Sequence, residues 1–456
     1  MTATIAAVAT PPGEGSISVI RISGPEAAAV ADRAFHARSG RRIEQAAGYT
    51  ALFGTVCRPS SGEAVDEAVA LVFRAPHSYT GEDVVELSCH GGTAVTREVL
   101  HCVMDAGAAP AQAGEFTKRA FLNGKMDLAQ AESVMQLISA QGRAAARAAL
   151  GTLGGRLSRD VGGVREDLLS LAAHLSAFAD YPEDEIPELR EEQVEEALSR
   201  AAAELDTLLG RFDTGKLIRE GVTAVIAGRP NVGKSALMNL LAGEERSIVA
   251  DLEGTTRDVV EETVRIAGVT LRLADTAGLR ETDDPVEKIG VQRARSRLDG
   301  AQLILAVFDR SRPLDPEDER LLDACDGRPA VAVVNKSDLE QRLDLSPIRK
   351  KIPFCAEICA RDGSGAENLE QAVSQALGTA GFDAGAPLLI SDRQRDCCSR
   401  ALAAVQEALE AVRTGVTLDA VTVCIQDALG ALMELTGERV GEAVVDEVFS
   451  RFCVGK

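Results

Sequence analysis

The chain of 456 residues is long enough for about three domains, and a hydrophobic content of 45% with 26% charged residues is typical of a globular protein. A formal net charge of −21, no Trp and three Tyr argue against a general nucleic-acid binder, which is normally basic and carries aromatic stacking platforms. No apolar run reaches the length of a membrane span, and the ten cysteines show no CxxC spacing, so we expect a cytoplasmic protein with reduced thiols and no membrane contact.

Residues 1–118 alternate short β-rich runs with helical patterns, which predicts an α/β domain. The β-rich runs are 16–22, 68–73 and 84–88, and the helical patterns are 27–35 and 94–106. Turn signals such as Pro11-Pro12-Gly13 separate them.

From residue 119 to 220 the pattern becomes helical, with apolar residues three and four positions apart. A stripe predicted to face a core consists of Leu168, Leu169, Leu171, Leu175 and Phe178.

The sequence GRPNVGKS at 228–235 follows an apolar run suited to a buried strand and precedes a helical stretch. This is the pattern of a phosphate-binding loop. Gly228 and Gly233 let the backbone fold tightly around phosphate, Lys234 reaches the outer phosphates, and the Ser235 hydroxyl suits Mg²⁺. The loop predicts a nucleoside triphosphatase.

Three further elements follow in the order expected for a GTPase. Residues 254–258, Gly-Thr-Thr-Arg-Asp, suit a switch that closes on Mg²⁺, and 275–278, Asp-Thr-Ala-Gly, suit a sensor of the metal and the γ-phosphate. Residues 335–338, Asn-Lys-Ser-Asp, follow a buried-strand run, and the Asp338 carboxylate suits the two N–H donors of guanine, a pair that adenine lacks. The order resembles that of the translation-factor-like GTPases and implies a Ras-like P-loop G domain with a doubly wound sheet at 221–380.

The guanine-side loop is expected at Cys359-Ala360-Arg361, where such families usually show Ser-Ala-Lys or Ser-Ala-Arg. Backbone N–H contacts to the base survive a change from Ser to Cys. Residues 381–456 are helical again, so the economical interpretation is one discontinuous helical domain, 119–220 and 381–456, interrupted by the inserted G domain.

Several stretches outside the GTPase motifs are distinctive. They are ATPPG at 9–13, SYTGED at 78–83, GEFTKRAFLNGK at 114–125 and FCVGK at 452–456. Together with GRPNVGKS and DTAGLR they resemble the MnmE (TrmE) family of tRNA uridine-modifying GTPases along the whole chain.

The resemblance implies a function and partners. These proteins add an aminomethyl or carboxymethylaminomethyl group to carbon 5 of the wobble uridine of certain tRNAs. They act with MnmG (GidA), a partner that carries the FAD, in a heterotetramer or larger assembly. The one-carbon unit comes from 5,10-methylene- or 5-formyl-tetrahydrofolate. The resemblance also implies a homodimer, with dimerisation and folate binding in residues 1–118.

The family's folate site maps onto Arg21, Glu86, Lys125 and Lys456. Cationic side chains suit the glutamate carboxylates of folate, and a carboxylate suits its pterin donors. The alternative for each residue is a surface salt bridge. Cys453 is a secondary candidate, and the alternative for it is an ordinary thiol.

Hydrolysis needs a group other than the usual Gln, because the position after DTAG is Leu279. The resemblance places the catalytic role on Glu287. It also implies a K⁺ ion that neutralises developing charge once two G domains dimerise. The expected K⁺ ligands are Asn231, Ala250, Leu252 and Thr255, and the expected Mg²⁺ ligands are Ser235 and Thr256.

The residues expected to contact GTP are Asn231, Val232, Gly233, Lys234, Ser235, Ala236, Ala250, Asp251, Leu252, Glu253, Gly254, Thr255, Thr256, Asp275, Thr276, Ala277, Gly278, Asn335, Lys336, Asp338, Cys359, Ala360 and Arg361.

The alternative function is a regulatory GTPase switch in ribosome assembly without a folate site. Proteins of that class typically carry a basic RNA-binding module, whereas this chain is acidic and ends in FCVGK. A passive scaffold is disfavoured by the intact GTPase motifs.

Overall fold

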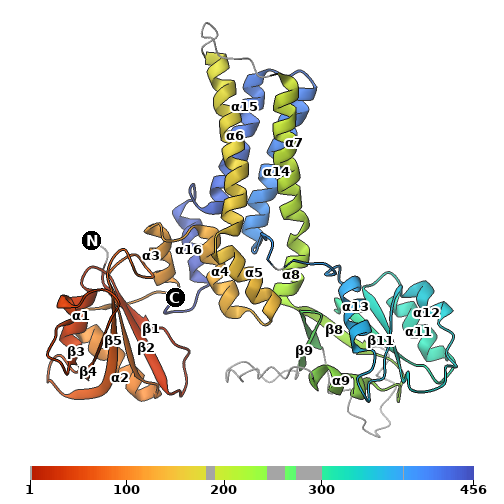
Figure 1. Cartoon of the computed structure of the whole chain (residues 1–456), viewed down its shortest axis with the longest axis horizontal. Coiled ribbons are helices and arrows are strands. Elements are labelled where there is room, and N and C mark those ends of the chain that lie inside the picture. The colour runs from red at the N-terminus through yellow and green to blue at the C-terminus, as the bar shows by residue number, and fades with distance from the viewer. Residues whose placement is uncertain (1–2, 181–189, 244–261, 274–299, 384) are drawn as a thin grey trace. The chain divides into compact units, whose positions relative to one another are not determined.

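The computed structural model describes residues 3–180, 190–243, 262–273, 300–383 and 385–456 (Figure 1). The chain forms two compact units. The first comprises Met1–Met135, Leu153–Ala203 and Asp396–Lys456, and the second comprises Gln136–Thr152 and Glu204–Arg395. These limits differ from the domain boundaries expected at 118/119, 220/221 and 380/381, which stay a prediction.

A seven-stranded sheet dominates the N-terminal part of the first unit, in the order β3-β4-β5-β6-β2-β1-β7. The strands are β1 (Ile5–Val8), β2 (Ile17–Ser23), β3 (Phe35–Ala37), β4 (Thr50–Cys57), β5 (Ala64–Phe73), β6 (Val84–His90) and β7 (Ala109–Pro110). Helices α1 (Ala27–Ala34) and α2 (Thr93–Asp105) pack against the sheet, and a short 3₁₀ turn covers Ile43–Gln45. The α/β architecture expected for this region is confirmed.

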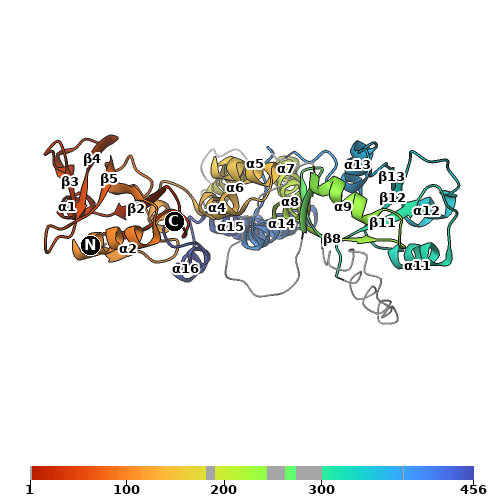
Figure 2. The same cartoon turned by 90° about the horizontal axis from the view of Figure 1, so that it is seen from below.

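Long helices that belong mostly to the first unit lie side by side in Figures 1 and 2. They are α6 (Arg156–Asp180), α7 (Glu191–Gly210), α14 (Asp392–Arg413) and α15 (Leu418–Thr436). Helix α6 buries Val161, Val164, Leu168, Leu171 and Leu175, a spacing of three and four that forms one face. Leu169 is 55% exposed, so its predicted place in the stripe was wrong: one residue along a helix is a turn of about 100° away from Leu168.

Three shorter helices connect the sheet to the C-terminal residues of the chain. They are α3 (Glu115–Leu122), α4 (Leu128–Ser139) and α16 (Glu442–Ser450). Leu128, Phe449 and Phe452 share a core cluster, and the Phe449 and Phe452 rings lie 5.2 Å apart. This cluster attaches the C-terminal segment to residues from the first third of the chain.

The second unit is built on a six-stranded sheet in the order β13-β12-β11-β8-β10-β9. The strands are β8 (Val222–Ala227), β9 (Glu262–Ile266), β10 (Val269–Leu273), β11 (Leu303–Asp309), β12 (Ala330–Asn335) and β13 (Phe354–Glu357). All neighbouring pairs are parallel except β9 with β10. Because strands β11 and β12 are buried on both faces, they read as continuous apolar runs.

Helices cover both faces of this sheet, as in a doubly wound fold. Leu237 of α9 (Lys234–Gly243) and Val373 of α13 (Ala366–Ala376) belong to one core cluster. Leu322 of α11 (Pro316–Cys325) and Ile348 of α12 (Ser346–Lys351) belong to the other.

The helical segment 136–152 belongs to this unit although it precedes the sheet by many residues. Ala145 of α5 (Arg143–Leu153) is buried in the same cluster as Ile266 and Val269, and Arg265 donates to the carbonyl of Gln141. Helix α8 (Phe212–Glu220) leads directly into β8.

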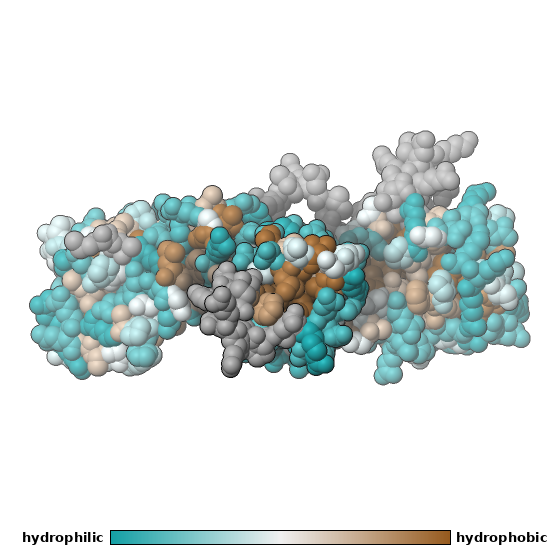
Figure 3. Space-filling view, turned by 90° about the horizontal axis from the view of Figure 1, so that it is seen from above, coloured by the Kyte–Doolittle hydropathy of each residue, from teal (hydrophilic) through white to brown (hydrophobic). Residues whose placement is uncertain are grey.

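Apolar residues lie both on the surface of the molecule and along the described helices, as Figure 3 and the helix sequences show. Figure 3 shows a mainly hydrophilic surface with an apolar area over the helices of the first unit, whose exposed apolar residues include Leu169 and Val423. Among the described helices, none combines the length and apolar character of a membrane span. All ten cysteines lie in the described ranges, and they form no disulfide with one another there.

Candidate nucleotide and folate sites

The phosphate loop follows β8 and needs glycine at two positions. A Cβ at Gly228 would lie 2.5 Å from the carbonyl oxygen of Val307, and Gly233 has φ +99° with its Cβ position 2.2 Å from Asn335 Nδ2. A side chain at Gly228 would collide with the backbone of β11, and one at Gly233 would collide with the Asn335 side chain. The glycines therefore let the loop pack against β11 and the guanine-side residues.

Lys234 is the first residue of α9, and its ammonium is fixed within the loop. The Nζ atom donates to the carbonyl oxygens of Gly228 and Arg229, each at 2.8 Å. Asn231, which lies between Arg229 and Lys234 in the loop, is exposed and has φ 66°. Asn tolerates this left-handed backbone conformation better than most residues.

Asn335, at the end of β12, connects three segments of the second unit. It is 3% exposed; its Nδ2 donates to the carbonyl oxygen of Val232 at 2.9 Å, and its Oδ1 accepts from the N–H of Ala360 at 2.9 Å. The side chain satisfies polar backbone groups that would otherwise be buried unpaired. The guanine-reading loop is thus bonded to the phosphate loop and to the guanine-side loop.

Cys359 stands in the loop expected on the guanine side and contacts Asp338, the carboxylate expected to read the base. Its Sγ donates to Oδ1 of Asp338 at 3.5 Å, and its thiol is buried while Asp338 is exposed. The backbone N–H of Cys359 bonds to the carbonyl of Ser364 at 2.8 Å, which closes the loop. A thiol here occupies the place of the usual serine hydroxyl.

These loops follow the carboxyl ends of parallel strands β8, β12 and β13, the edge where ligands bind in doubly wound sheets. The structure thus brings together Asn231, Val232, Gly233, Lys234, Ser235 and Ala236 with Asn335, Lys336, Asp338, Cys359, Ala360 and Arg361. The remaining predicted GTP, metal and catalytic residues lie outside the described ranges; they are Ala250, Asp251, Leu252, Glu253, Gly254, Thr255, Thr256, Asp275, Thr276, Ala277, Gly278 and Glu287.

A second arrangement attaches the phosphate loop to α11. Arg229 forms ion pairs with Asp315 and Asp318, and Asp315 caps the helix by accepting from the N–H groups of Glu317 and Asp318. The backbone hydrogen bond from Asp318 and the Arg229 guanidinium hold the pKa of Asp315 below its ordinary value. Burial raises the pKa of Asp318. Through Arg229, the start of the phosphate loop is therefore held by two carboxylates that lie outside the loop.

In the first unit, two predicted folate residues form an ion pair. Arg21 of β2 and Glu86 of β6 face each other in the strand register, with Arg21 Nε 2.8 Å from Glu86 Oε1. The guanidinium lies 5.1 Å from the ring of Tyr79 and 5.6 Å from that of Phe116. Because the pair is mostly buried, the Arg21 guanidinium holds the Glu86 carboxylate in one orientation.

The C-terminal residues join this cluster. Val454 forms an antiparallel bridge with Ala113, and the N–H of Phe116 donates to the carbonyl of Lys456 at 3.2 Å. Gly455 has φ +98° and its Cβ position lies 2.2 Å from the carbonyl oxygen of Val8. The tail, defined as residues 453–456, therefore lies against the sheet, and Cys453 within it is exposed.

Lys125 contacts the 76–81 loop, which also carries Tyr79. Its Nζ donates to the carbonyl of Pro76 at 3.0 Å, and its side chain packs beside Gly81. Tyr79, in the same loop, contacts Arg21. All four predicted folate residues thus belong to one neighbourhood of the first unit.

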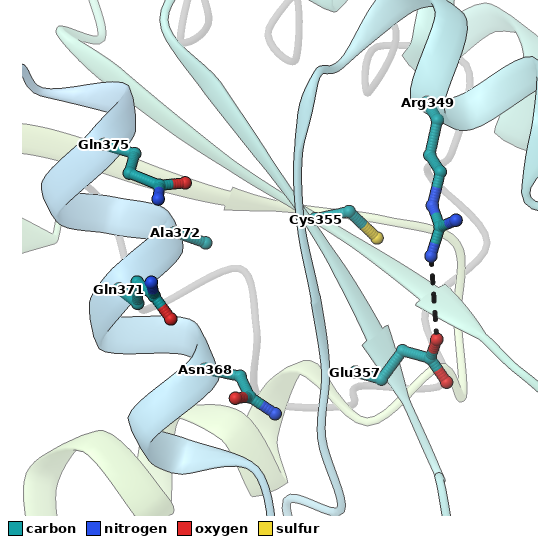
Figure 4. A pocket seen from close by; sticks show the side chains of 7 residues that line it. All are labelled: Arg349, Cys355, Glu357, Asn368, Gln371, Ala372 and Gln375. Atoms are coloured by element: carbon teal, nitrogen blue, oxygen red, sulfur yellow. Dashed lines mark ion pairs between the residues drawn. The ribbon is translucent and has the colours of Figure 1, made fainter.

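A cavity of about 420 Å³ lies elsewhere in the second unit, beside the edge strand β13 (Figure 4). It is lined by Arg349, Cys355, Glu357, Asn368, Gln371, Ala372 and Gln375. None of these is a predicted site residue. Arg349 and Glu357 form an ion pair, with 4.0 Å between Nη2 and Oε1. Within the described ranges, no group of three His, Cys, Asp or Glu side chains is arranged to hold a metal.

Comparisons with known proteins agree with this arrangement. A family profile described as the MnmE helical domain matches residues 128–453, and one described as the GTP-binding protein TrmE N-terminus matches residues 4–125. The tRNA modification GTPase MnmE of Heliobacterium modesticaldum is 44% identical over 463 residues, which cover 99% of each chain. The chain belongs to the MnmE family.

A second MnmE relative, from Symbiobacterium thermophilum, is 45% identical over 456 residues and also covers 99% of each chain. The resemblance read from the motifs is therefore confirmed. Among solved structures, the G domain of the T. maritima FeoB iron transporter matches 34% of this chain and 98% of its own at 24% identity, with a TM-score of 0.25.

Sequence reasoning did not single out two groups of residues that the structure of this MnmE-family chain places at the sites. Tyr79 and Phe116 flank Arg21, although both stand in motifs already noted as distinctive. Asp309 contacts Lys336 of the 335–338 loop, and Arg229, within the phosphate loop, pairs with Asp318 of α11. The signal for Asp309 is present in the sequence, because it is an acidic residue that ends a continuous buried strand.

Proposed function

We propose that this protein hydrolyses GTP as one subunit of a tRNA-modifying complex that adds a (carboxymethyl)aminomethyl group to carbon 5 of the wobble uridine. Membership of the MnmE family supports the tRNA substrate. The observation that supports GTP hydrolysis is the Asn335 side chain. From the guanine-reading loop it bonds to the phosphate loop at Val232 and to the guanine-side loop at Ala360.

Two measurements test this proposal. Purified protein should hydrolyse GTP and leave ATP nearly untouched. In cells that lack the protein, nucleoside analysis of tRNA should show loss of the modified uridine, restored by the unaltered gene and not by Lys234→Ala. Unchanged tRNA together with immature ribosomal subunits would favour the alternative, a regulatory switch in ribosome assembly.

For hydrolysis we assign Mg²⁺ to Ser235 and Thr256 and K⁺ to Asn231, Ala250, Leu252 and Thr255. Hard cations prefer oxygen ligands, and Ser235 at the first turn of α9 supplies one. When bound, the two cations neutralise charge on the phosphates. Glu287 takes the water-activating role that Leu279 cannot perform.

We assign tetrahydrofolate binding to Arg21, Glu86, Lys125 and Lys456, with Cys453 as a secondary candidate. The Arg21–Glu86 pair supports a site in which Glu86 meets the pterin N–H donors while Arg21 holds it in place. Calorimetry with 5-formyltetrahydrofolate should show binding that Glu86→Gln weakens about tenfold or more. Glu67→Gln, on the neighbouring strand and paired with Arg38, should bind as the unaltered protein does.

We further propose a cytoplasmic homodimer, with dimerisation through residues 1–118, that assembles with the FAD-dependent partner MnmG. Light scattering of the purified protein measures dimerisation, and light scattering of its mixture with that partner measures assembly of the complex. A monomer that stays separate from the partner would contradict the assembly while leaving GTP hydrolysis open.

A further inference from the structure

Asp309 is the last residue of β11, and it lies between the strands that carry the two nucleotide loops. Strand β11 pairs with β8 on one side and β12 on the other, and Figure 2 labels the three strands. In the register of β11 and β12, Asp309 lies opposite Asn335. The Asp309 side chain is 2% exposed. A carboxylate so buried needs partners that hold it charged, because burying an unpaired charge is strongly unfavourable.

The two carboxylate oxygens of Asp309 have different partners. Oδ1 accepts from the N–H of Ser311 at 2.9 Å and from its Oγ at 2.7 Å. Oδ2 accepts from Nζ of Lys336 at 2.6 Å. One oxygen therefore closes the turn after β11, and the other serves the guanine-reading motif.

Burial raises the pKa of Asp309, but the hydrogen bonds from Lys336 and Ser311 outweigh burial and lower the pKa below its ordinary value. The carboxylate is accordingly charged at neutral pH. Its charge is matched by the ammonium of Lys336.

Lys336 extends the contact to the phosphate loop. The same Nζ donates to the carbonyl oxygen of Asn231 at 2.8 Å. Lys336 has φ 64° and Asn231 has φ 66°, left-handed backbone conformations that are unfavourable for most residues other than glycine and persist where surrounding contacts fix them. The ammonium of Lys336, itself in a left-handed conformation, therefore bonds to the backbone of Asn231, which is in the same conformation.

We propose that Asp309 is a positioning residue for guanine-nucleotide binding: through Oδ2 it holds Lys336, and through Lys336 it holds the backbone of the phosphate loop at Asn231. This inference rests on the proposed GTPase function. It assigns Asp309 a role at the site without contact to the nucleotide.

The substitution Asp309→Asn separates the two roles of the carboxylate. An amide keeps an oxygen for Ser311 but presents an NH₂ group to Lys336, so donor faces donor. Full-length protein should bind mant-GDP about 10- to 100-fold more weakly, because a charge-assisted hydrogen bond is lost and the ammonium loses its anion. The loss should be similar for a GTP analogue, because the guanine-reading loop is affected and GDP and GTP share the same base.

Two comparisons exclude a merely structural effect. Ser311→Ala removes a hydrogen bond from Oδ1 and leaves the Lys336 contact, so its mant-GDP affinity should stay within about twofold of the unaltered protein. In a Lys336→Ala background, Asp309→Asn should add little further loss, because the two residues act as a unit.

Equal affinities of Asp309→Asn and the unaltered protein would overturn the inference. So would an undiminished loss in the Lys336→Ala background, or a loss in Ser311→Ala as large as that in Asp309→Asn. If the unaltered protein itself failed to bind mant-GDP, the proposed GTPase function would be wrong instead, so the two failures are distinguishable.

Discussion

The side-chain amide of Asn335 lies 2.9 Å from the carbonyl oxygen of Val232, and this hydrogen bond joins the guanine-reading loop to the phosphate loop. The same side chain accepts from the N–H of Ala360. A single buried residue thus holds together three loops that come from separate parts of the sequence.

Asn335→Ala should weaken GTP and GDP binding by about 10- to 100-fold, because it leaves the Val232 carbonyl and the Ala360 N–H buried without their partner. Equilibrium binding of fluorescent nucleotides measures the loss. Asn239→Ala, at an exposed position of α9, is the matched control and should bind normally. Equal binding by both variants would show that the three-loop connection is dispensable.

Cys359→Ser should bind GTP as tightly as the unaltered protein or several-fold more tightly, because a hydroxyl is a better donor than a thiol to Asp338 Oδ1. Cys359→Ala should bind more weakly. Cys355→Ser in β13 controls for the general effect of replacing a thiol. If Ser and Ala variants bind alike, the thiol does not orient the carboxylate.

Gly455→Ala should displace the tail, since its Cβ would meet the Val8 carbonyl oxygen and the residue has φ +98°. Folate binding should fall while GTP turnover persists, and carboxypeptidase should remove the tail faster. Gly441→Ala, where no atom lies within 4 Å and φ is −70°, is the matched control. A tail that stays protected would contradict the contact with Val8.

GTP turnover should be much faster in KCl than in NaCl at equal ionic strength, with Asn231→Ala losing most of this preference. The exposed Asn231 side chain and the absence of a Gln at Leu279 motivate the expectation. Glu287→Ala should bind GTP and fail to hydrolyse it. Equal rates in the two salts would remove the K⁺ assignment, and normal hydrolysis by the Glu287 variant would move the catalytic role elsewhere.

Local pattern predicted much of the second unit. The apolar runs before 228–235 and 335–338 became β8 and β12, because a strand buried on both faces must be apolar throughout. The link from Asn335 to Val232 could not be predicted in the same way, since it depends on how parallel strands align across more than a hundred residues.

The folate residues show a different limit. The sequence assigns Arg21 and Glu86 to opposite groups of the ligand, yet the β2–β6 register places the two residues opposite each other, where they pair. Charge alone does not reveal whether a cation and an anion face a ligand or one another. Leu169 shows the same limit on α6, where adjacent leucines point to different faces.

The packing of α5 against β9 and β10 affects how the nucleotide-binding unit can be cut out of the chain. A fragment that begins at residue 221 would leave Ala145 and its neighbours behind and expose Ile266 and Val269 to water. A fragment of that length would expose an apolar face and tend to aggregate. Helix α5 is thus part of the core of the second unit although it precedes β8 in sequence, and a fragment designed to keep that core whole includes it.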